Sequence, residues 1–276
     1  MIIESTHVSQ NIDLLIAAGC SFTEVQHPYS DMGTEIPIAD YPDIYFTWTV
    51  HLMHHLKCKT NYQGRGAAGN RIISTAAIHS TLEALKTHNR DNILVGIMWS
   101  GSYRHDVYYS EPLLDYYEDL GLSNIDLVTS VHNPTSIVGI NNRNYYRVMP
   151  YWEDELSKTY YKHIYDDRGS LISTLEHILR TQWFLKVNNI KYFMTSHHPA
   201  ALPETHKNHP DVKYLWDAID WDSFLPVKNE WDWLKENVDS NLDNRIGNSN
   251  PHPTTEMNQR FTNEVIIPYL KERNYI

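Results

Sequence analysis

Apolar residues gather in three short runs along the chain, at residues 13–19, 92–99 and 190–195. Each run has the length of a strand, and its mostly apolar character is typical of strands buried on both faces of a sheet. Residues 59–63 are more polar and predict a further short strand ahead of a glycine-rich segment at residues 64–70. Four strands are therefore expected.

Apolar and aromatic side chains recur at helical spacing around these strands. The predicted helices cover residues 43–57, 71–88, 170–188 and 254–273, with Pro268 expected to kink the last. Strands that alternate with helices are the signature of a parallel sheet covered on both sides. The predicted fold class is therefore α/β, a three-layer α/β/α sandwich with a central parallel sheet, formed as a single domain by residues 1–276.

Residues 101–169 interrupt this alternation and hold more than half of the nineteen tyrosines. Four tyrosine pairs lie there: Tyr108-Tyr109, Tyr116-Tyr117, Tyr145-Tyr146 and Tyr160-Tyr161. We interpret the segment as a Tyr-rich insertion after the third strand, with some helix of its own. Its rings can stack on sugars, but aromatic residues are equally typical of subunit interfaces. Substrate binding and homo-oligomerisation both stay open for it.

Composition narrows the range of partners. The formal net charge of −11 repels a phosphate backbone, and no cluster of Lys and Arg reverses it locally, so no nucleic-acid partner is expected. No apolar run reaches membrane-spanning length, and the first residues lack the pattern of a signal peptide. Cys20 and Cys58 give no disulfide framework. A cytoplasmic or viral protein without a membrane partner is expected.

Sixteen histidines raise the question of a metal site. His51 and His55 are four residues apart on a predicted helix, but the glutamate of the zinc-protease signature is missing after the first of them. No cluster of cysteines or carboxylates completes a ligand set. The glycine-rich segment lacks the Lys and Ser/Thr of a phosphate loop, and its glycine spacing does not fit a dinucleotide fingerprint. No metal and no cofactor are expected.

Ser21 is the candidate nucleophile, because it directly follows the first strand and reactive residues gather at the carboxyl ends of parallel strands. A serine hydroxyl needs a base within hydrogen-bond reach. His252 is the best candidate, since it lies between two prolines just before the last predicted helix, and prolines limit the freedom of the loop that would aim the imidazole. A helix-capping role for Ser21 is the competing interpretation.

These residues resemble the motifs of the SGNH (GDSL-like) hydrolase family. The family's first block is matched by Gly19-Cys20-Ser21-Phe22-Thr23, with Cys where the family has Asp. The glycine after strand two is matched by Gly66, and the histidine before the last helix by His252. The blocks occur in family order over nearly the whole chain, apart from the insertion. The resemblance implies a flavodoxin-like SGNH fold and a serine esterase that needs no cofactor.

The resemblance also implies an oxyanion hole formed by the amides of Ser21 and Gly66 and a side-chain donor. After strand three the family has Gly-x-Asn-Asp, where this chain reads Gly96-Ile-Met-Trp-Ser-Gly-Ser102. The family's Asn donor is therefore missing. Asn70 is the expected replacement, and Ser100 is the alternative.

The acid that orients the histidine is the second departure from the family. Where the family has Asp shortly before the histidine, this chain has Ser249 and Asn250, and Asp243 is the nearest carboxylate upstream. Asn250 can accept from the imidazole N–H and hold its tautomer, but it cannot stabilise the imidazolium as a carboxylate would. A slow Ser-His dyad assisted by Asn250 is expected.

Four further residues lie at or near the carboxyl ends of strands and are expected to contact the substrate: His197, His198, Trp99 and Tyr103. Cys20 is the alternative nucleophile. Side chains alternate along a strand, so Cys20 is expected to point to the face opposite Ser21 and to pack as a small core residue.

The function predicted from these residues is hydrolysis of small acyl esters, with O-acetyl groups on carbohydrate as the preferred substrate because the Tyr-rich insertion offers rings for sugar stacking. Two alternatives stay open. A member of the family that has lost its triad acid and Asn donor would be a binding or structural protein, and an acyltransferase would use the same acyl-enzyme chemistry.

Overall fold

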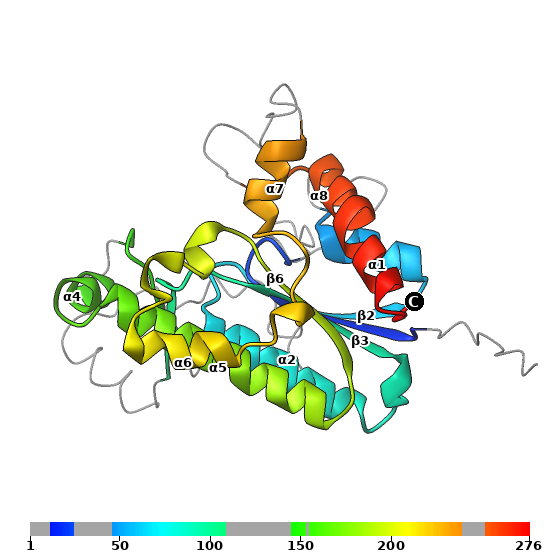
Figure 1. The fold of residues 1–276 in the computed structure, drawn as a ribbon, viewed down its shortest axis with the longest axis horizontal. Coiled ribbons are helices and arrows are strands. Elements are labelled where there is room, and N and C mark those ends of the chain that lie inside the picture. Colours follow the sequence, from blue (N-terminus) through cyan, green and yellow to red (C-terminus); the bar gives the residue numbers. More distant parts are fainter. Residues whose placement is uncertain (1–11, 25–45, 109–144, 153–154, 239–251) are drawn as a thin grey trace, which may run out of the picture.

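The computed structural model describes residues 12–24, 46–108, 145–152, 155–238 and 252–276. Its centre is a parallel four-stranded sheet in the order β2-β1-β3-β6 (Figure 1). The strands are β1 (Leu14–Gly19), β2 (Lys59–Gly64), β3 (Ile93–Trp99) and β6 (Lys191–Ser196). All four predicted strands are present, and every residue of β1 and β3 is buried.

Register fixes which strand ends lie together. Gly19 of β1 pairs with Gly64 of β2, and Trp99 of β3 pairs with Ser196 of β6. The turns that follow these strands therefore lie along one edge of the sheet, the carboxyl edge. Ser21, the glycine-rich segment, Ser100 and His197 all come from those turns.

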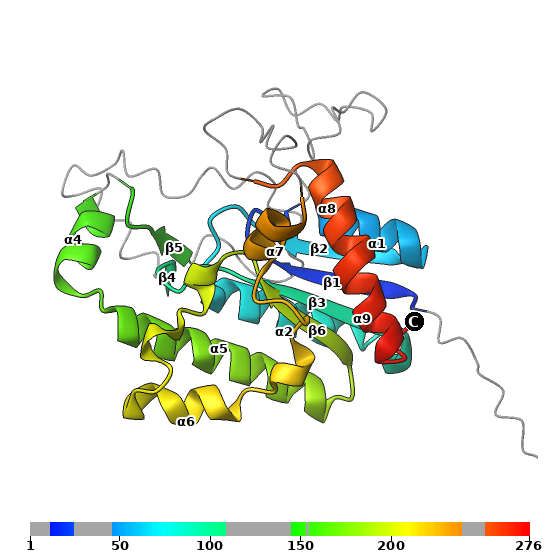
Figure 2. The ribbon, with the colours of Figure 1, turned by 45° about the horizontal axis from the view of Figure 1, so that its top comes forward.

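Helices cover both faces of the sheet (Figures 1 and 2), which confirms the three-layer α/β/α prediction. The helices on one face are α2 (Asn70–Ala84), α5 (Asp167–Val187) and α6 (Pro210–Ala218). They pack on alternate residues of β1 such as Leu14, Ile16 and Ala18. This face holds the largest of the three buried apolar clusters among the described residues.

The other face is covered by α1 (Trp48–Leu56) and by the C-terminal helical segment. That segment consists of α8 (Thr255–Phe261), the π turn η9 (Thr262–Ile266) and α9 (Ile267–Glu272). Leu15, Ala17 and Cys20 pack into this second cluster. The π turn ends two residues before Pro268, where a proline removes one helical hydrogen bond and crowds the preceding turn. The kink predicted at Pro268 stays a prediction; the structure shows a local change of helical pitch ahead of this proline.

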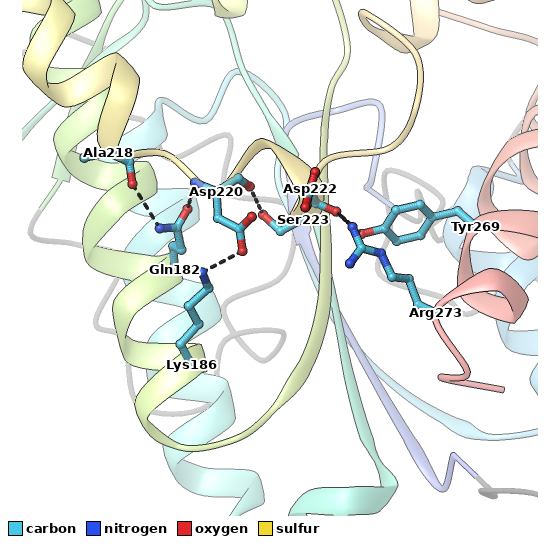
Figure 3. A network of polar contacts seen from close by, with 8 residues as sticks. All are labelled: Gln182, Lys186, Ala218, Asp220, Asp222, Ser223, Tyr269 and Arg273. Carbon is cyan, nitrogen blue, oxygen red and sulfur yellow. Dashed lines mark hydrogen bonds and ion pairs between the residues drawn. The ribbon is translucent and has the colours of Figure 1, made fainter.

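The free edge of β6 is covered by the chain that follows α6. Leu225 N donates to Met194 O at 2.9 Å, and Phe224 forms an isolated parallel bridge with Met194. Figure 3 shows how polar contacts hold this crossing between the two helical layers. On one side Lys186 pairs with Asp220 at 2.6 Å, and on the other Tyr269 donates to the Asp222 carbonyl at 2.8 Å. The segment thus links α5 to α9 across the sheet edge.

The segment 101–169 departs from the alternating pattern, as expected for an insertion. It contains the antiparallel pair β4 (His105–Tyr108) and β5 (Tyr145–Val148), then α4 (Glu155–His163). Residues 109–144, which include Tyr116-Tyr117, lie outside the described residues, so the substrate-binding and interface interpretations of the tyrosine pairs stay predictions. The remaining short elements are η3 (Arg90–Asn92), η5 (Pro199–Ala201), η6 (Glu204–His206), η7 (Trp221–Ser223) and α7 (Glu230–Asn237).

Candidate active site

The turn after β1 places Ser21 at the carboxyl edge of the sheet. The Cys20 carbonyl accepts from Thr23 N at 2.9 Å and from Glu24 N at 3.0 Å, which closes a tight turn around Ser21. Gly19 is required just before it, because a Cβ there would lie 2.1 Å from Thr23 Oγ1. Cys20 is fully buried in the second cluster, whereas Ser21 is partly exposed. Cys20 packs as a core residue, as expected, but it does so beside Leu15 and Ala17, so the alternation of β1 ends at Gly19.

The structure brings Ser21 and His252 together although 231 positions separate them in sequence. Ser21 Oγ lies 2.6 Å from His252 Nε2. When the imidazole is neutral with its proton on Nδ1, the serine hydroxyl donates to Nε2. This is the geometry that a serine nucleophile and its general base require.

Asn258 anchors the loop that carries His252. Its Nδ2 donates to the Thr254 carbonyl at 3.0 Å and to the Pro253 carbonyl at 3.3 Å, while its Oδ1 accepts from Trp48 N at 3.0 Å. The amide therefore ties the start of α8 to the start of α1. The sequence analysis missed this residue, because an Asn within an amphipathic helix gives no signal of what it will contact.

Phe22 holds the imidazole from the side. Its ring centroid lies 4.7 Å from that of His252 and also 4.7 Å from that of His197. Contact with two rings restricts the rotation of His252. The Phe that follows the nucleophile is thus a positioning residue for the candidate base.

His252 is kept neutral by its surroundings. Burial lowers the pKa of His252, and the positive charge of Arg104 lowers it further. A neutral imidazole at pH 7 can accept the serine proton, whereas an imidazolium cannot. The electrostatics of the site therefore favour the base form.

His197 does not offer the substrate contact that was expected of it. It is only 3% exposed, and its Nδ1 donates to the Trp99 carbonyl at 3.1 Å. Burial lowers the pKa of His197 to about 3, so the ring stays neutral and packs against Phe22. Trp99 itself is fully buried, in the apolar cluster on the face covered by α2, α5 and α6. The ends of β3 and β6 thus carry both side chains into the interior of the protein.

His198 and Tyr103 remain within reach of the surface. His198 is partly buried beside Trp231, with ring centroids 6.0 Å apart, and its Nδ1 accepts from Ala200 N at 3.2 Å. Tyr103 is partly exposed, and its ring faces the guanidinium of Arg104 at 5.8 Å. Their role in substrate contact stays a prediction.

The glycine-rich segment packs directly against the Ser21 turn. Arg65 N donates to the Gly19 carbonyl at 3.1 Å, and a Cβ on Gly64 would lie 2.4 Å from Glu24 N. Gly66 is the residue after Arg65, so its backbone lies next to the turn that carries Ser21. The Ala67 backbone has a φ of 60°, a left-handed conformation that marks a sharp change of direction here.

Asn70 has a different task from the one expected. Its Oδ1 accepts from Ser100 N at 2.8 Å, and its Nδ2 donates to the Ser100 carbonyl at 3.0 Å and to Thr174 Oγ1 at 3.1 Å. Both N–H groups of the amide are engaged, so no N–H is left for an oxyanion in this conformation. Asn70 instead clamps the chain at the end of β3 to the start of α2.

The remaining candidates are Ser100 for the oxyanion hole and Asn250 and Asp243 for orienting His252. The Ser100 side chain is fully buried, and its hydroxyl has no hydrogen-bond partner among the described residues. Asn250 and Asp243, the candidates for orienting His252, lie outside the described residues. Within the part of the chain that the structure describes, no group of three or more His, Cys, Asp or Glu could hold a metal ion.

Arg104 is a site residue that the sequence analysis missed. Its Nε and Nη1 are buried and have no hydrogen-bond partner among the described residues, yet its charge lowers the pKa values of His252 and His197. The sequence offered a weak signal: this arginine follows the end of β3 by five positions, two residues after the segment that was compared with the family's Asn block. Its role depends on three-dimensional contacts that spacing alone does not reveal.

The fold and these contacts define a class: an α/β/α protein with a serine–histidine pair at the carboxyl edge of its parallel sheet. No protein-family model and no curated protein matches the chain. One solved structure is similar, described as an alpha/beta hydrolase enzyme, LAE5, from the metagenome of Lake Arreo, Spain. The identity is 12%, the TM-score is 0.36, and the match covers 94% of this chain and 95% of that one. A likeness at that TM-score says nothing of this chain's activity. None of the described helices has the length and apolar character needed to cross a bilayer.

Proposed function

We propose that the protein is a serine hydrolase of the SGNH type that cleaves small acyl esters, with O-acetyl groups on carbohydrate as the preferred substrates. The observation that carries the proposal is the 2.6 Å separation of Ser21 Oγ and His252 Nε2. The order of the motifs supports it: the serine follows β1, the glycine follows β2 and the histidine precedes the last helix, as in the family that the sequence resembles.

The chemistry follows from these positions. His252 Nε2 accepts the Ser21 hydroxyl proton while Oγ attacks the ester carbonyl carbon, and the carbonyl oxygen becomes an oxyanion. The imidazolium then donates that proton to the departing alcohol, and the C–O bond to the alcohol breaks. A water attacks the acyl-serine, again with His252 as base, and releases the carboxylic acid and free Ser21.

Backbone amides are the proposed donors to the oxyanion. The turns that carry Ser21 and Gly66 lie against each other, so their N–H groups can converge on one oxygen. Since both side-chain N–H groups of Asn70 are engaged elsewhere, we do not assign Asn70 the role of the family's side-chain donor. Removing one such donor typically costs about 10²–10³-fold in rate, so modest activity is expected.

Covalent labelling with a fluorophosphonate probe tests the proposal. The whole chain should be labelled in proportion to time, and Ser21→Ala and His252→Ala should abolish labelling while the circular dichroism spectrum is kept. Cys20→Ala is the matched control: it removes a neighbouring thiol that is fully buried and should leave labelling intact. A folded parent protein that takes no label would leave the binding or structural alternative. Acyl transfer to an added sugar in place of hydrolysis would favour the acyltransferase.

A further inference from the structure

A cavity of about 790 Å³ lies in the segment that covers the free edge of β6. Its volume is within the range of small-ligand sites. The lining comes from the end of β6, from η5, η6 and η7, and from the last turn of α6 and the start of α7. Ser21 and His252 do not line it, so the cavity is separate from the candidate catalytic pair.

The cavity nevertheless lies beside that pair, at the same edge of the sheet. Ser196, the last residue of β6, lines the cavity, and the next residue, His197, packs its ring on Phe22 with the centroids 4.7 Å apart. Phe22 directly follows Ser21 and packs equally closely on His252. A single buried residue, His197, thus connects the wall of the cavity to the ring that packs on the candidate base.

Three aromatic rings form one wall of the cavity. Trp221 stands between Trp216 and Phe224, with ring centroids 4.7 Å and 5.1 Å apart, and all three line the cavity. Trp221 Nε1 donates to the Trp216 carbonyl at 3.1 Å, so its polar edge is satisfied within the protein. The side of Trp221 that remains is 36% exposed. The negative face of such a ring attracts the weakly positive C–H groups on one face of a sugar.

The backbone on both sides of Trp221 is held in place. Asp220, the residue before it, pairs with Lys186 at 2.6 Å, and the carbonyl of Asp222, the residue after it, accepts from the Tyr269 hydroxyl at 2.8 Å (Figure 3). The exposed indole is therefore fixed before a ligand arrives. Binding to a fixed surface loses less conformational freedom, which favours affinity.

The charged side chains of the lining balance one another. Two carboxylates, Glu204 and Asp232, stand against two ammonium groups, Lys207 and Lys228. Glu204 pairs with Lys207 at 2.6 Å, and Asp232 Oδ2 accepts from Asn229 Nδ2 at 2.8 Å. A lining without net charge favours a neutral ligand. An alkyl chain would desolvate these polar groups without bonding to them, whereas hydroxyl groups both donate to carboxylates and accept from ammonium groups.

We propose that this cavity binds a neutral sugar residue, which stacks on Trp221 and forms hydrogen bonds with Asp232 and Lys228. The inference rests on the proposed function in one respect: the sugar is taken to belong to the glycan whose ester Ser21 attacks. Binding of the sugar does not itself require catalysis, so the two proposals can fail separately.

Calorimetric titration of the folded Ser21→Ala chain tests the inference without turnover. The probes are the neutral oligosaccharides cellohexaose, xylohexaose and mannohexaose, with octan-1-ol as an apolar probe. At least one oligosaccharide is expected to bind with a Kd of about 1 mM or lower and more tightly than octan-1-ol. Raising the ionic strength from about 0.05 M to about 0.5 M should change that Kd by less than about 2-fold, because a neutral sugar carries no charge to screen.

Substitutions in the same background locate the bound sugar. Trp221→Ala should weaken oligosaccharide binding by at least about 10-fold, and Trp221→Phe, which keeps a ring, should weaken it less. The matched control is Trp183→Ala, which removes a tryptophan of α5 that is 57% exposed and lies outside the cavity, and it should leave the affinity unchanged. Lys228 is exposed, so Lys228→Met should fold even if Trp221→Ala does not, and it should weaken binding by at least about 3-fold.

Four results would overturn the inference: no binding of any of the three oligosaccharides, tighter binding of octan-1-ol than of all three, unchanged affinity in folded Trp221→Ala, or unchanged affinity in Lys228→Met. Oligosaccharide binding by a protein whose parent takes no fluorophosphonate label would remove the hydrolase proposal and leave the sugar site standing. Labelling without oligosaccharide binding would do the reverse.

Discussion

At the scale of single residues, the site depends on how a few side chains share hydrogen bonds. Ser21 and His252 meet directly, while Phe22, Asn258 and Arg104 act on the imidazole by packing, anchoring and charge. The direct contact explains how a serine can be activated, and the three supporting residues explain why the imidazole stays neutral and aimed.

Arg104 contributes to the pH at which His252 becomes a base. Burial lowers the pKa of His252, and the positive charge of Arg104 lowers it further. Activity should rise as pH rises through that pKa, so Arg104→Met should move the acid limb of kcat/KM to higher pH. A small neutral ester such as p-nitrophenyl acetate is the substrate for both profiles. Arg104→Lys retains the charge and should shift the limb less; identical profiles for parent and Arg104→Met would contradict the prediction.

Substitution of Asn70 distinguishes a structural role, in which its amide holds Ser100, from a role as oxyanion donor. Its three bonds to Ser100 and Thr174 predict that Asn70→Ala lowers the free energy of unfolding by about 1–3 kcal/mol, because buried backbone groups at Ser100 lose their partner. Urea unfolding measures this. Ser100→Ala leaves the backbone clamp intact and removes only an unpaired hydroxyl, so its change should stay within about 1 kcal/mol. A fall of 10²–10³-fold in kcat at unchanged stability would instead make Asn70 an oxyanion donor.

At the scale of helices and strands, the site lies where the starts of α1 and α8 approach the carboxyl ends of β1 and β2. Asn258 joins α8 to α1 by accepting from Trp48 N. It also donates to the carbonyls of Pro253 and Thr254, the two residues that follow His252. The position of the imidazole is therefore set by the packing of α8 on α1 rather than by its own loop alone.

Asn258→Ala should therefore weaken both stability and activity. We expect a loss of about 1–3 kcal/mol in unfolding free energy, because the buried Trp48 N–H is left unpaired, and a lower kcat because His252 is less well held. Asn263→Ala, an exposed change in the same helical segment, is the matched control and should stay within about 0.5 kcal/mol. Full activity in Asn258→Ala would show that the loop needs no such anchor.

Glu230, the first residue of α7, is a buried carboxyl group with no hydrogen-bond partner for either oxygen among the described residues. Burial raises the pKa of Glu230 to about 8. The native state therefore keeps a proton that the unfolded chain releases above about pH 4.3, and stability falls as pH rises from there through 8.

Glu230→Gln should remove that loss. The variant is expected to gain over the parent as pH rises from 5 to 8, reaching on the order of 3 kcal/mol at pH 7 because the amide has no ionised form to desolvate. Urea unfolding at several pH values measures the difference between the two proteins. A difference that does not change with pH would mean that the carboxyl is solvated or paired in solution.

The elements that the sequence predicted are those whose pattern is local. The buried strands β1, β3 and β6 follow from short apolar runs, and α2 and α5 follow from helical periodicity. The short polar elements β4, β5 and α7 were missed, because their form depends on what they pack against. The pairing of Ser21 with His252 was predicted from the strand end, the two prolines and the family order, whereas the occupied amide of Asn70 and the position of the Arg104 charge depend on tertiary contacts that no local pattern encodes.

At the scale of the whole molecule, two apolar clusters fix the sheet between its helical layers and bring the two ends of the described chain to one site. Three histidines, His105, His177 and His197, lie buried or half-buried in the protein and are neutral. Burial, with local positive charge for His197 and His177, lowers the pKa of His197 to about 3 and those of His105 and His177 to about 4. The stability of the protein at acidic pH therefore depends on the burial of these rings in the folded structure.

The fold should lose stability steeply on acidification. In the unfolded chain a histidine has a pKa near 6.5. Below that pH the unfolded state binds protons that the native state does not bind. The stability that is present above pH 6.5 is therefore lost as pH falls toward 4. Three such groups, opposed by Glu230, give roughly 1–3 kcal/mol per pH unit between pH 6.5 and 5. Urea unfolding at pH 7, 6 and 5 measures the slope. His177→Gln should reduce it, while His163→Gln, an exposed change on α4, should not. A free energy of unfolding that stays constant from pH 7 to 5 would show that these three rings are already open to water in the native state.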